Sequence, residues 1–164
     1  MEANKQIRVT VIMPAYNSEK YIERSIKSVL SQTHTALELI VVDDGSTDRT
    51  PAILRRLAAG DSRLRFLRTD NHGPAEARNA ALKQVSPDTD YITFIDADDE
   101  LLPDALQYAL EPADSGADLI LFGFSIVEAD GRERDYHEFD CLVRSQDMRT
   151  AFPRLYKANL LNQV

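Results

Sequence analysis

Short apolar runs alternate with stretches of helical periodicity along the chain as far as Val127. The apolar runs are rich in β-branched residues and are bounded by turn-forming or acidic residues, which is typical of strands. They predict strands at 7–13, 37–44, 64–69, 91–95 and 117–127. Between these runs, apolar residues recur on one face of a helix. The periodicity predicts helices at 17–33, 46–60, 73–85 and 103–110.

Capping residues indicate where the first two helices begin and end. Ser18 is expected to cap the first helix, and Ser46 or Thr47 the second. Pro51 is tolerated in a first helical turn, and Gly60 is expected to close the second helix.

The polar stretch that begins at Glu128 departs from this alternation. Its Asp130-Gly131 pair predicts the turn of a hairpin. The segment 145–164 is expected to form a helix that is broken near Pro153.

The order of the elements predicts the fold class. Strands separated by helices of this length imply βαβ crossovers and a mostly parallel sheet with helices on both faces, an α/β sandwich. In such sheets, ligands bind at the carboxyl ends of the strands. Three of the predicted strands end in polar clusters, at 14–17, 43–46 and 96–99. We therefore expect all three clusters to lie on one edge of the sheet.

Composition narrows the class of protein. A chain of 164 residues with 43% hydrophobic and 28% charged residues is typical of one globular domain. Its formal net charge of -8 argues against nucleic acid or anionic lipid as a partner. The single Cys141 excludes an internal disulfide. Without a secretory signal or a membrane span, we expect a cytoplasmic protein, peripheral to the inner face of the membrane at most in a full-length form.

Four acids gather directly after the strand at 91–95, in the sequence IDADDE. Carboxylates packed this tightly repel one another unless positive charge offsets them. Mg²⁺ or Mn²⁺ takes one or two carboxylates and fills its remaining positions with waters and phosphates. The alternative is a solvated turn in which Asp99 or Glu100 caps the following helix. A calcium loop of the EF-hand type is excluded, because Leu101 and Gln107 stand where it needs glycine and glutamate.

The other polar positions each allow a structural and a functional interpretation. Asp44 could belong to a tight turn at Gly45, or accept the imide N–H of a uracil ring. Tyr16 could follow a simple proline turn, or stack on a base. Arg78 could be a plain surface residue, or reach Asp96 or a ligand phosphate. The chain contains neither a phosphate-binding loop nor the glycine fingerprint of a dinucleotide site.

Taken together and in order, these segments resemble one family. The nucleotide-binding half of a family 2 glycosyltransferase with the GT-A fold is similar to VTVIMPAYNSEKYIERSIKSVLSQT, ELIVVDDGSTDRT, NHGPAEARNAAL and YITFIDADD. The resemblance covers about residues 7–125, with a departure at Ala81, where the family commonly has glycine. It implies a Rossmann-like α/β/α sandwich. It also implies a donor-binding core at 1–127 and the start of the acceptor-side region at 128–164.

The resemblance implies a set of site residues. The nucleotide would be bound by Pro14, Ala15, Tyr16, Asp44, Asn71, Arg78 and Asp96. The first four would surround the base of a nucleoside-diphosphate sugar, usually a UDP-sugar. Asp98 would bind Mn²⁺ or Mg²⁺ directly, and Asp96 would approach the ribose and the metal.

The activity that the resemblance implies is inverting transfer of the sugar to a glycan, a lipid-linked molecule or another hydroxyl acceptor. A carboxylate base would deprotonate the acceptor while the metal stabilises the leaving diphosphate. In the family this base follows well after the acid-x-acid cluster, so we expect it beyond Val164 and expect this chain to be a truncated donor-binding domain. Two alternatives stay open: a binding or assembly module without turnover, and a nucleotidyltransferase. The second lacks its glycine-rich loop after the first strand.

Overall fold

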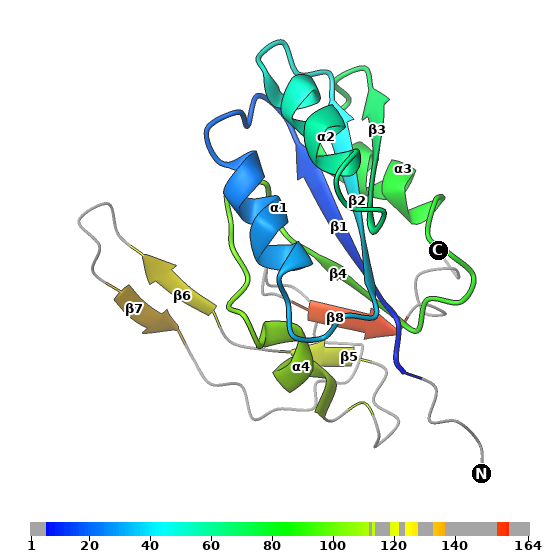
Figure 1. The fold of residues 1–164 in the computed structure, drawn as a ribbon, viewed down its shortest axis with the longest axis vertical. Helices are drawn as coiled ribbons and strands as arrows, with labels where there is room; N and C mark the ends of the chain where they lie inside the picture. The colour runs from blue at the N-terminus through cyan, green and yellow to red at the C-terminus, as the bar shows by residue number, and fades with distance from the viewer. Residues whose placement is uncertain are drawn as a thin grey trace.

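The computed structural model describes residues 6–111 and 113 with their side chains, and the backbone of four later strands. Its centre is a six-stranded sheet with the strand order β3-β2-β1-β4-β8-β5 (Figure 1). Four of these strands are parallel: β1 (Val9–Ala15), β2 (Leu37–Asp44), β3 (Leu64–Thr69) and β4 (Tyr91–Phe94). They form the parallel sheet that the sequence predicts.

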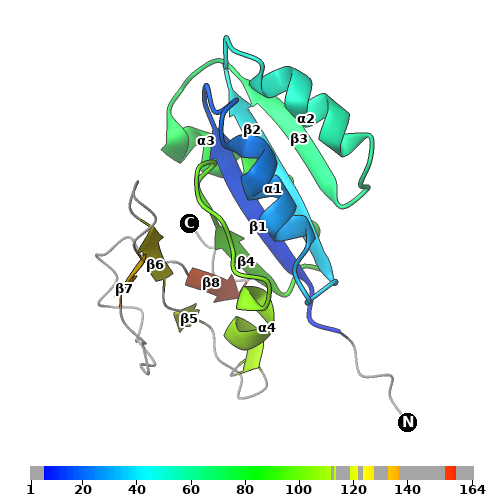
Figure 2. The same ribbon diagram turned by 60° about the vertical axis from the view of Figure 1, so that its left-hand side comes forward.

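Short antiparallel strands extend the sheet beyond β4. β8 (Arg154–Lys157) pairs with β4 on one side and with β5 (Leu119–Leu121) on the other. β6 (Phe124–Val127) and β7 (Glu133–Tyr136) form a separate antiparallel pair, on the side of the molecule away from β3 (Figure 2). The structure therefore divides the expected strand at 117–127 into β5 and β6. The antiparallel pairing of β6 with β7 confirms the expected hairpin, and its predicted Asp130-Gly131 turn lies outside the described residues.

Helices cover both faces of the parallel strands. α1 (Ile22–Leu30), α2 (Thr50–Ala58) and α4 (Ala105–Leu110) pack on one face, and α3 (Pro74–Leu82) packs on the other (Figure 1). Strand side chains alternate between two hydrophobic cores, because successive residues point to opposite faces. The first core contains Val9, Val11, Met13, Leu39 and Val41, and the second contains Ile12, Ile40, Val42, Ala77 and Ala81. This arrangement is the predicted α/β sandwich.

Helices α1 and α2 begin later than the sequence predicts. α1 begins at Ile22 and is not capped by Ser18, and α2 begins at Thr50 and is capped by neither Ser46 nor Thr47. Instead, Ser18, Ser46 and Thr47 form hydrogen bonds that join the segment after β1 to the segment after β2. They can do so because the carboxyl ends of β1 and β2 lie side by side.

The helix expected near the end of the chain is wrong at 154–157, which form β8. The expectation rested on local composition and on the break at Pro153. A strand depends instead on partners that lie far away in the sequence, here β4 and β5. The rest of that expected helix lies outside the described residues, as does Cys141.

No helix in the described part of the chain is both long enough and apolar enough to cross a membrane. The cytoplasmic location and the division of the chain between 127 and 128 stay predictions.

Candidate functional site

The carboxyl ends of β1, β2 and β4 meet at one edge of the sheet. These strands are parallel neighbours, with Ala15 opposite Asp43 and Ile12 opposite Phe94. The segments that follow them therefore leave the sheet side by side. This confirms the prediction that the three polar clusters of the sequence lie on a single edge.

Tyr16 presents its ring at this edge. Pro14 and Ala15 are buried within β1, whereas Tyr16 is 48% exposed. The next residue, Asn17, has a φ of 48° and donates its N–H to the Ser46 hydroxyl at 2.9 Å. Its side-chain oxygen accepts a second hydrogen bond from the same loop at 2.8 Å. These bonds fix the backbone beside Tyr16 and leave its ring accessible to a planar ligand.

Asp44 ends β2 with a buried carboxylate that has three internal donors. The Thr69 hydroxyl at 2.8 Å and the His72 N–H at 2.9 Å donate to Oδ1, and the Gly73 N–H donates to Oδ2 at 2.7 Å. Burial raises the pKa of this carboxyl, but the three hydrogen bonds outweigh burial and hold the pKa below its usual value. Asp44 is therefore ionised and organises the loop at 70–73, and Oδ2 keeps a lone pair for one further donor.

The turn after Asp44 packs directly against the loop at 70–73. Gly45 has a φ of +77°, and a Cβ at this position would lie 2.9 Å from the backbone nitrogen of Asn71. Asn71 has a φ of 41° and is exposed. The loop can approach β2 this closely because position 45 has no side chain. The structure thus places Asn71 beside Asp44, at the same edge as Tyr16.

Asp43 is a buried acid that the sequence analysis did not single out. Its carboxylate pairs with Nη1 of Arg68 at 2.9 Å and accepts the Ser46 N–H at 3.0 Å. Arg68 also donates to the carbonyl of Ser46 at 2.7 Å. Asp43 and Arg68 stand opposite each other in the register of β2 and β3. The contact between Asp43 and Arg68 could therefore be predicted only from the register of β2 and β3. It holds the turn that follows β2.

Arg78 and Asp96 form an ion pair between α3 and the end of β4. Nη2 of Arg78 lies 2.6 Å from Oδ1 of Asp96, so the predicted carboxylate partner of Arg78 is present. Both side chains keep exposed surface, 32% for Arg78 and 57% for Asp96. Gly73, the residue before α3, bonds to Asp44. Helix α3 thus links the carboxylate at the end of β2 to the carboxylate after β4.

Asp98 and Asp99 carry the uncompensated charge of the site. Both are exposed, and neither carboxylate forms a hydrogen bond or ion pair with the described residues. Protein atoms around the Asp99 carboxyl displace part of its water and raise its pKa, and the charges of Asp98 and Asp96 raise the pKa further. Arg24 of α1 approaches, but it donates to the backbone carbonyl of Asp98 at 3.4 Å and pairs with another acid, Glu100, at 3.1 Å.

The alternative interpretation of these acids as helix caps is wrong. Helix α4 begins at Ala105, its N-cap residue is Asp104, and no side chain caps it. Neither Asp99 nor Glu100 is close enough in the chain to cap this helix. Asp99 and Glu100 therefore do not cap the helix that follows them.

The described residues do not include a group of three or more acids, histidines or cysteines arranged to enclose a metal ion. This does not conflict with Mg²⁺ or Mn²⁺ chemistry, because such ions are commonly held by one or two carboxylates together with phosphates. Asp96 and Asp98 fit a cation that is shared with a phosphorylated ligand. They do not fit a closed site made of protein ligands alone.

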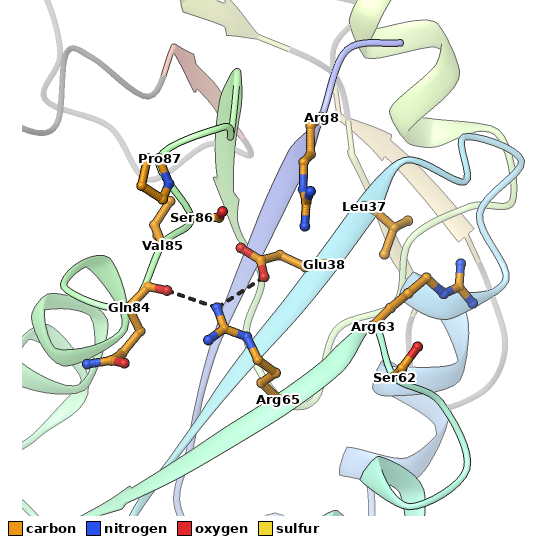
Figure 3. Close-up of a pocket in the computed structure, with 10 residues that line it drawn as sticks. All are labelled: Arg8, Leu37, Glu38, Ser62, Arg63, Arg65, Gln84, Val85, Ser86 and Pro87. Carbon is orange, nitrogen blue, oxygen red and sulfur yellow. Dashed lines mark hydrogen bonds and ion pairs between the residues drawn. The ribbon is translucent and has the colours of Figure 1, made fainter. Parts of the chain in front are cut away.

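A separate hollow of about 530 Å³ lies at the opposite edge, where the parallel strands begin (Figure 3). It contains none of the candidate residues. Its buried Glu38 accepts hydrogen bonds from the Thr10 hydroxyl at 2.9 Å and from Nη2 of Arg65 at 3.1 Å. Arg65 also bonds to the carbonyl of Gln84 at 2.8 Å (Figure 3). These polar groups already have partners within the protein, and we assign no ligand to this hollow.

Known protein sequences are similar to this chain along most of its length. The family described as "Glycosyl transferase family 2" matches residues 10–162. "Glycosyltransferase GlyA" of Streptococcus pneumoniae is 30% identical in an alignment of 178 positions, which covers 96% of this chain and 25% of that protein. "GalNAc(5)-diNAcBac-PP-undecaprenol beta-1,3-glucosyltransferase" of Campylobacter jejuni is 35% identical over 126 residues, 76% of this chain and 40% of that protein. The chain thus spans less than half the length of these relatives.

Solved structures show the same fold. TarS 1-349 of S. aureus in complex with UDP superposes with a TM-score of 0.78 at 29% identity, over 96% of this chain and 48% of that one. The mannosyltransferase PcManGT of Pyrobaculum calidifontis, in complex with GDP-Man and Mn²⁺, gives a TM-score of 0.71 at 25% identity. That match covers 98% of this chain and 47% of the other.

Proposed function

Because the chain belongs to the glycosyl transferase family 2, we propose that it binds the nucleoside diphosphate of a sugar donor at the carboxyl edge of its parallel sheet. UDP is the proposed nucleotide, since a UDP complex is among the structures that share its fold. The base would lie beside Tyr16, and the diphosphate beside the acids that follow β4. The protein that contains this chain would transfer the sugar to a hydroxyl acceptor.

The proposed base pocket uses one aromatic ring and one carboxylate. Tyr16 offers an exposed ring for stacking, and the buried residues Pro14 and Ala15 form the strand end beneath the base. Asp44 is ionised and has a free lone pair on Oδ2, which suits the imide N–H of uracil. Asn71 lies close to the same position because its loop packs on Gly45.

The proposed diphosphate pocket combines a guanidinium group with carboxylates. Arg78 keeps exposed donors next to Asp96, and a phosphate approaching this pair would meet a positive charge. Asp98, together with Asp96, would hold Mn²⁺ or Mg²⁺ on the side of the phosphates. When bound, the cation supplies charge neutralisation for the departing diphosphate. The crowded carboxylates, which raise the pKa of Asp99, would then have a counter-charge.

For the reaction itself we propose inverting transfer to a glycan, a lipid-linked molecule or another hydroxyl. The acceptor hydroxyl must lose its proton to a base as it attacks the sugar. We assign this base to none of the described carboxylates, since Asp96 and Asp98 are engaged with the cation in this proposal. A module that binds the donor without turnover would have the same pocket. A sugar-transfer assay distinguishes the two, because such a module forms no product.

The observation that carries the proposal is the exposed carboxylate of Asp98, unpaired with the described residues, on the edge that also presents Tyr16. Calorimetric titration with UDP, with and without Mn²⁺, tests it. We expect Mn²⁺ to strengthen UDP binding about tenfold or more, as a carboxylate-held cation on a phosphate would. We expect Asp98→Ala to abolish that gain.

Asp104→Ala is the matched control, because Asp104 is an exposed acid of the same segment that makes no cap hydrogen bond. It should leave the gain intact. Equal UDP affinity with and without Mn²⁺ in the wild-type chain would contradict the proposed role of the cation. A gain that survives in Asp98→Ala would contradict the role of this residue.

A further inference from the structure

The segment that carries the proposed cation ligands has little regular structure of its own. This acidic loop, residues 95–104, connects β4 to α4. Its first N–H, that of Ile95, donates to the carbonyl of Ile12 in β1, and the Asp99 N–H donates to the carbonyl of Asp96 at 3.1 Å. Acids this close together repel one another. The loop therefore needs ties to the rest of the molecule if its carboxylates are to keep one arrangement.

Helix α1 and the residue shortly after it supply such ties through three polar side chains, Ser25, Ser28 and Gln32, which we call the α1 triplet. The hydroxyl of Ser25 donates to the carbonyl of Ala97 at 2.8 Å. The hydroxyl of Ser28 accepts the N–H of Leu101 at 3.0 Å. The first of these bonds reaches the residue that stands between Asp96 and Asp98.

Gln32 ties the end of the loop to the start of α4. Its Nε2 donates to the carbonyl of Leu102 at 2.6 Å, and its Oε1 accepts the N–H of Leu106 at 3.0 Å. The backbone of the next residue adds a further bond, from the N–H of Thr33 to the carbonyl of Pro103 at 3.0 Å. Helix α1 and the residues just after it thus bond to the loop at Ala97, Leu101, Leu102 and Pro103.

The spacing and burial of the α1 triplet show that these polar residues are not there for packing alone. Ser25 and Ser28 are three residues apart and share one face of α1, and Gln32 follows the end of the helix. Ser25 is fully buried and Gln32 is 3% exposed, although their neighbours on the core side of α1 are apolar. Burying a polar side chain is unfavourable unless it is hydrogen-bonded. Both side chains bond to carbonyls of the loop, and more weakly to carbonyls of α1, those of Tyr21 and Ser28.

We propose that Ser25, Ser28 and Gln32 are positioning residues of the donor site, which hold the acidic loop so that Asp98 and Asp96 face the cation and the diphosphate. This inference rests on the proposed function. None of the three touches the proposed ligand, and each acts through the loop backbone. The bond to Ala97 is the most direct, since it orients the peptide units on both sides of that residue.

Two variants and a matched control test this proposal by UDP calorimetry. Ser25→Ala and Ser28→Ala each remove one hydroxyl that bonds to the loop, without adding volume. Ser31→Ala is the control, because Ser31 is exposed and its hydroxyl bonds, among the described residues, only to the carbonyl of Ser28, at 3.4 Å. We expect the first two to reduce the Mn²⁺-dependent gain in UDP affinity about tenfold, which corresponds to the loss of one hydrogen bond to the loop, buried for Ser25 and partly buried for Ser28. Binding of UDP without metal should stay unchanged in all three.

A second readout needs no ligand. Amide hydrogen exchange should become about tenfold faster at Leu101 in Ser28→Ala, and faster at Leu106 in Gln32→Met, with unchanged exchange in β1. Unchanged exchange at these amides would overturn the positioning role. Faster exchange throughout the molecule, with equal losses of UDP affinity in the presence and absence of metal, would show a general stabilising role and also overturn it.

The two proposals can fail separately. If wild-type UDP binding does not respond to Mn²⁺, the proposed function loses its cation, and the α1 triplet loses its role toward that cation. The exchange data would still decide whether the triplet orders the loop. If wild-type binding does respond while Ser25→Ala and Ser28→Ala behave as Ser31→Ala does, the positioning role alone is overturned.

Discussion

Asp43 and Asp44 are adjacent in sequence but serve different parts of the molecule. Successive residues of a strand point to opposite faces. Asp43 accordingly pairs with Arg68 of β3, whereas Asp44 binds the N–H groups that precede α3. The two adjacent aspartates therefore hold two different segments: Asp43 holds the turn after β2, and Asp44 holds the loop at 70–73. Of the two, only Asp44 keeps a lone pair for a ligand at the proposed base pocket.

Replacing Asp44 by asparagine should destabilise the protein in a pH-dependent way. The pKa of Asp44 in the folded protein is lowered from its ordinary value of 3.8. Its ionised form therefore stabilises the fold fully above that value, and this contribution is lost as the pH falls through the folded pKa. We expect Asp44→Asn to lose about 2 kcal/mol at pH 7, the value of hydrogen bonds to a charged group.

Urea unfolding of wild type and Asp44→Asn from pH 7 to pH 3 checks this expectation. The difference in unfolding free energy should shrink below about pH 4, because the wild-type carboxyl then becomes protonated. Asp70→Asn, which changes an exposed acid with no side-chain partner in the described residues, should show no such trend. A difference that stays constant over the whole pH range would contradict the charge argument.

Gly45 allows the loop at 70–73 to pack closely against the carboxyl end of β2. Gly45→Ala would place a Cβ 2.9 Å from the Asn71 nitrogen and would force alanine into a φ of +77°. We expect a loss of about 2 kcal/mol or more in unfolding free energy. Gly60→Ala is the control, since its Cβ would lie 3.5 Å from the Leu57 carbonyl in ordinary contact. Comparable denaturation midpoints for the two variants would show that the loop can move aside.

At the scale of elements, helix α3 approaches the sheet closely because its inner face is alanine. Ala77 and Ala81 are buried against β1 and β2, together with Ile12 and Ile40. Arg78 lies on the same helix and pairs with Asp96, which follows β4. Alanine at position 81, where the family commonly has glycine, is still small enough for this packing.

Ala81→Leu should be costly for the same reason. Extra methylene groups in a filled core displace their neighbours, and we expect a loss of about 2 kcal/mol in unfolding free energy. Ala75→Leu, on the exposed side of the same helix, should change the free energy by less than about 0.5 kcal/mol. Chemical denaturation of both variants is the measurement. A similar effect of the two substitutions would mean that α3 is not tightly packed.

Local patterns predicted the strands better than the helix starts. The bounds of β2 and β3 agree with the strands predicted at 37–44 and 64–69. The starts of α1 and α2 were placed too early. Their expected caps are engaged in bonds between loops, such as Asn17 to Ser46, which depend on strand neighbours rather than on local sequence.

At the scale of the whole molecule, the candidate site lies where the strand order reverses. The chain runs outward from β1 through β2 to β3, and then returns to the other side of β1 for β4. Open α/β sheets bind ligands in the crevice at such a point. The position of the edge could therefore be predicted from the order of elements. The internal partners of Asp44, the Asp43–Arg68 pair and the ties from α1 could not, because they depend on register and on packing between distant segments.

The place of β8 in the sheet has a consequence for how the chain folds during synthesis. β1 to β4 can assemble once β4 has emerged, but the free side of β4 is then an unpaired edge. It is covered only when 154–157 arrive and insert between β4 and β5. Until then, the unpaired edge of β4 in the nascent domain is open to pairing with a strand of another chain. The negative charge of the four acids that follow β4 would discourage such pairing.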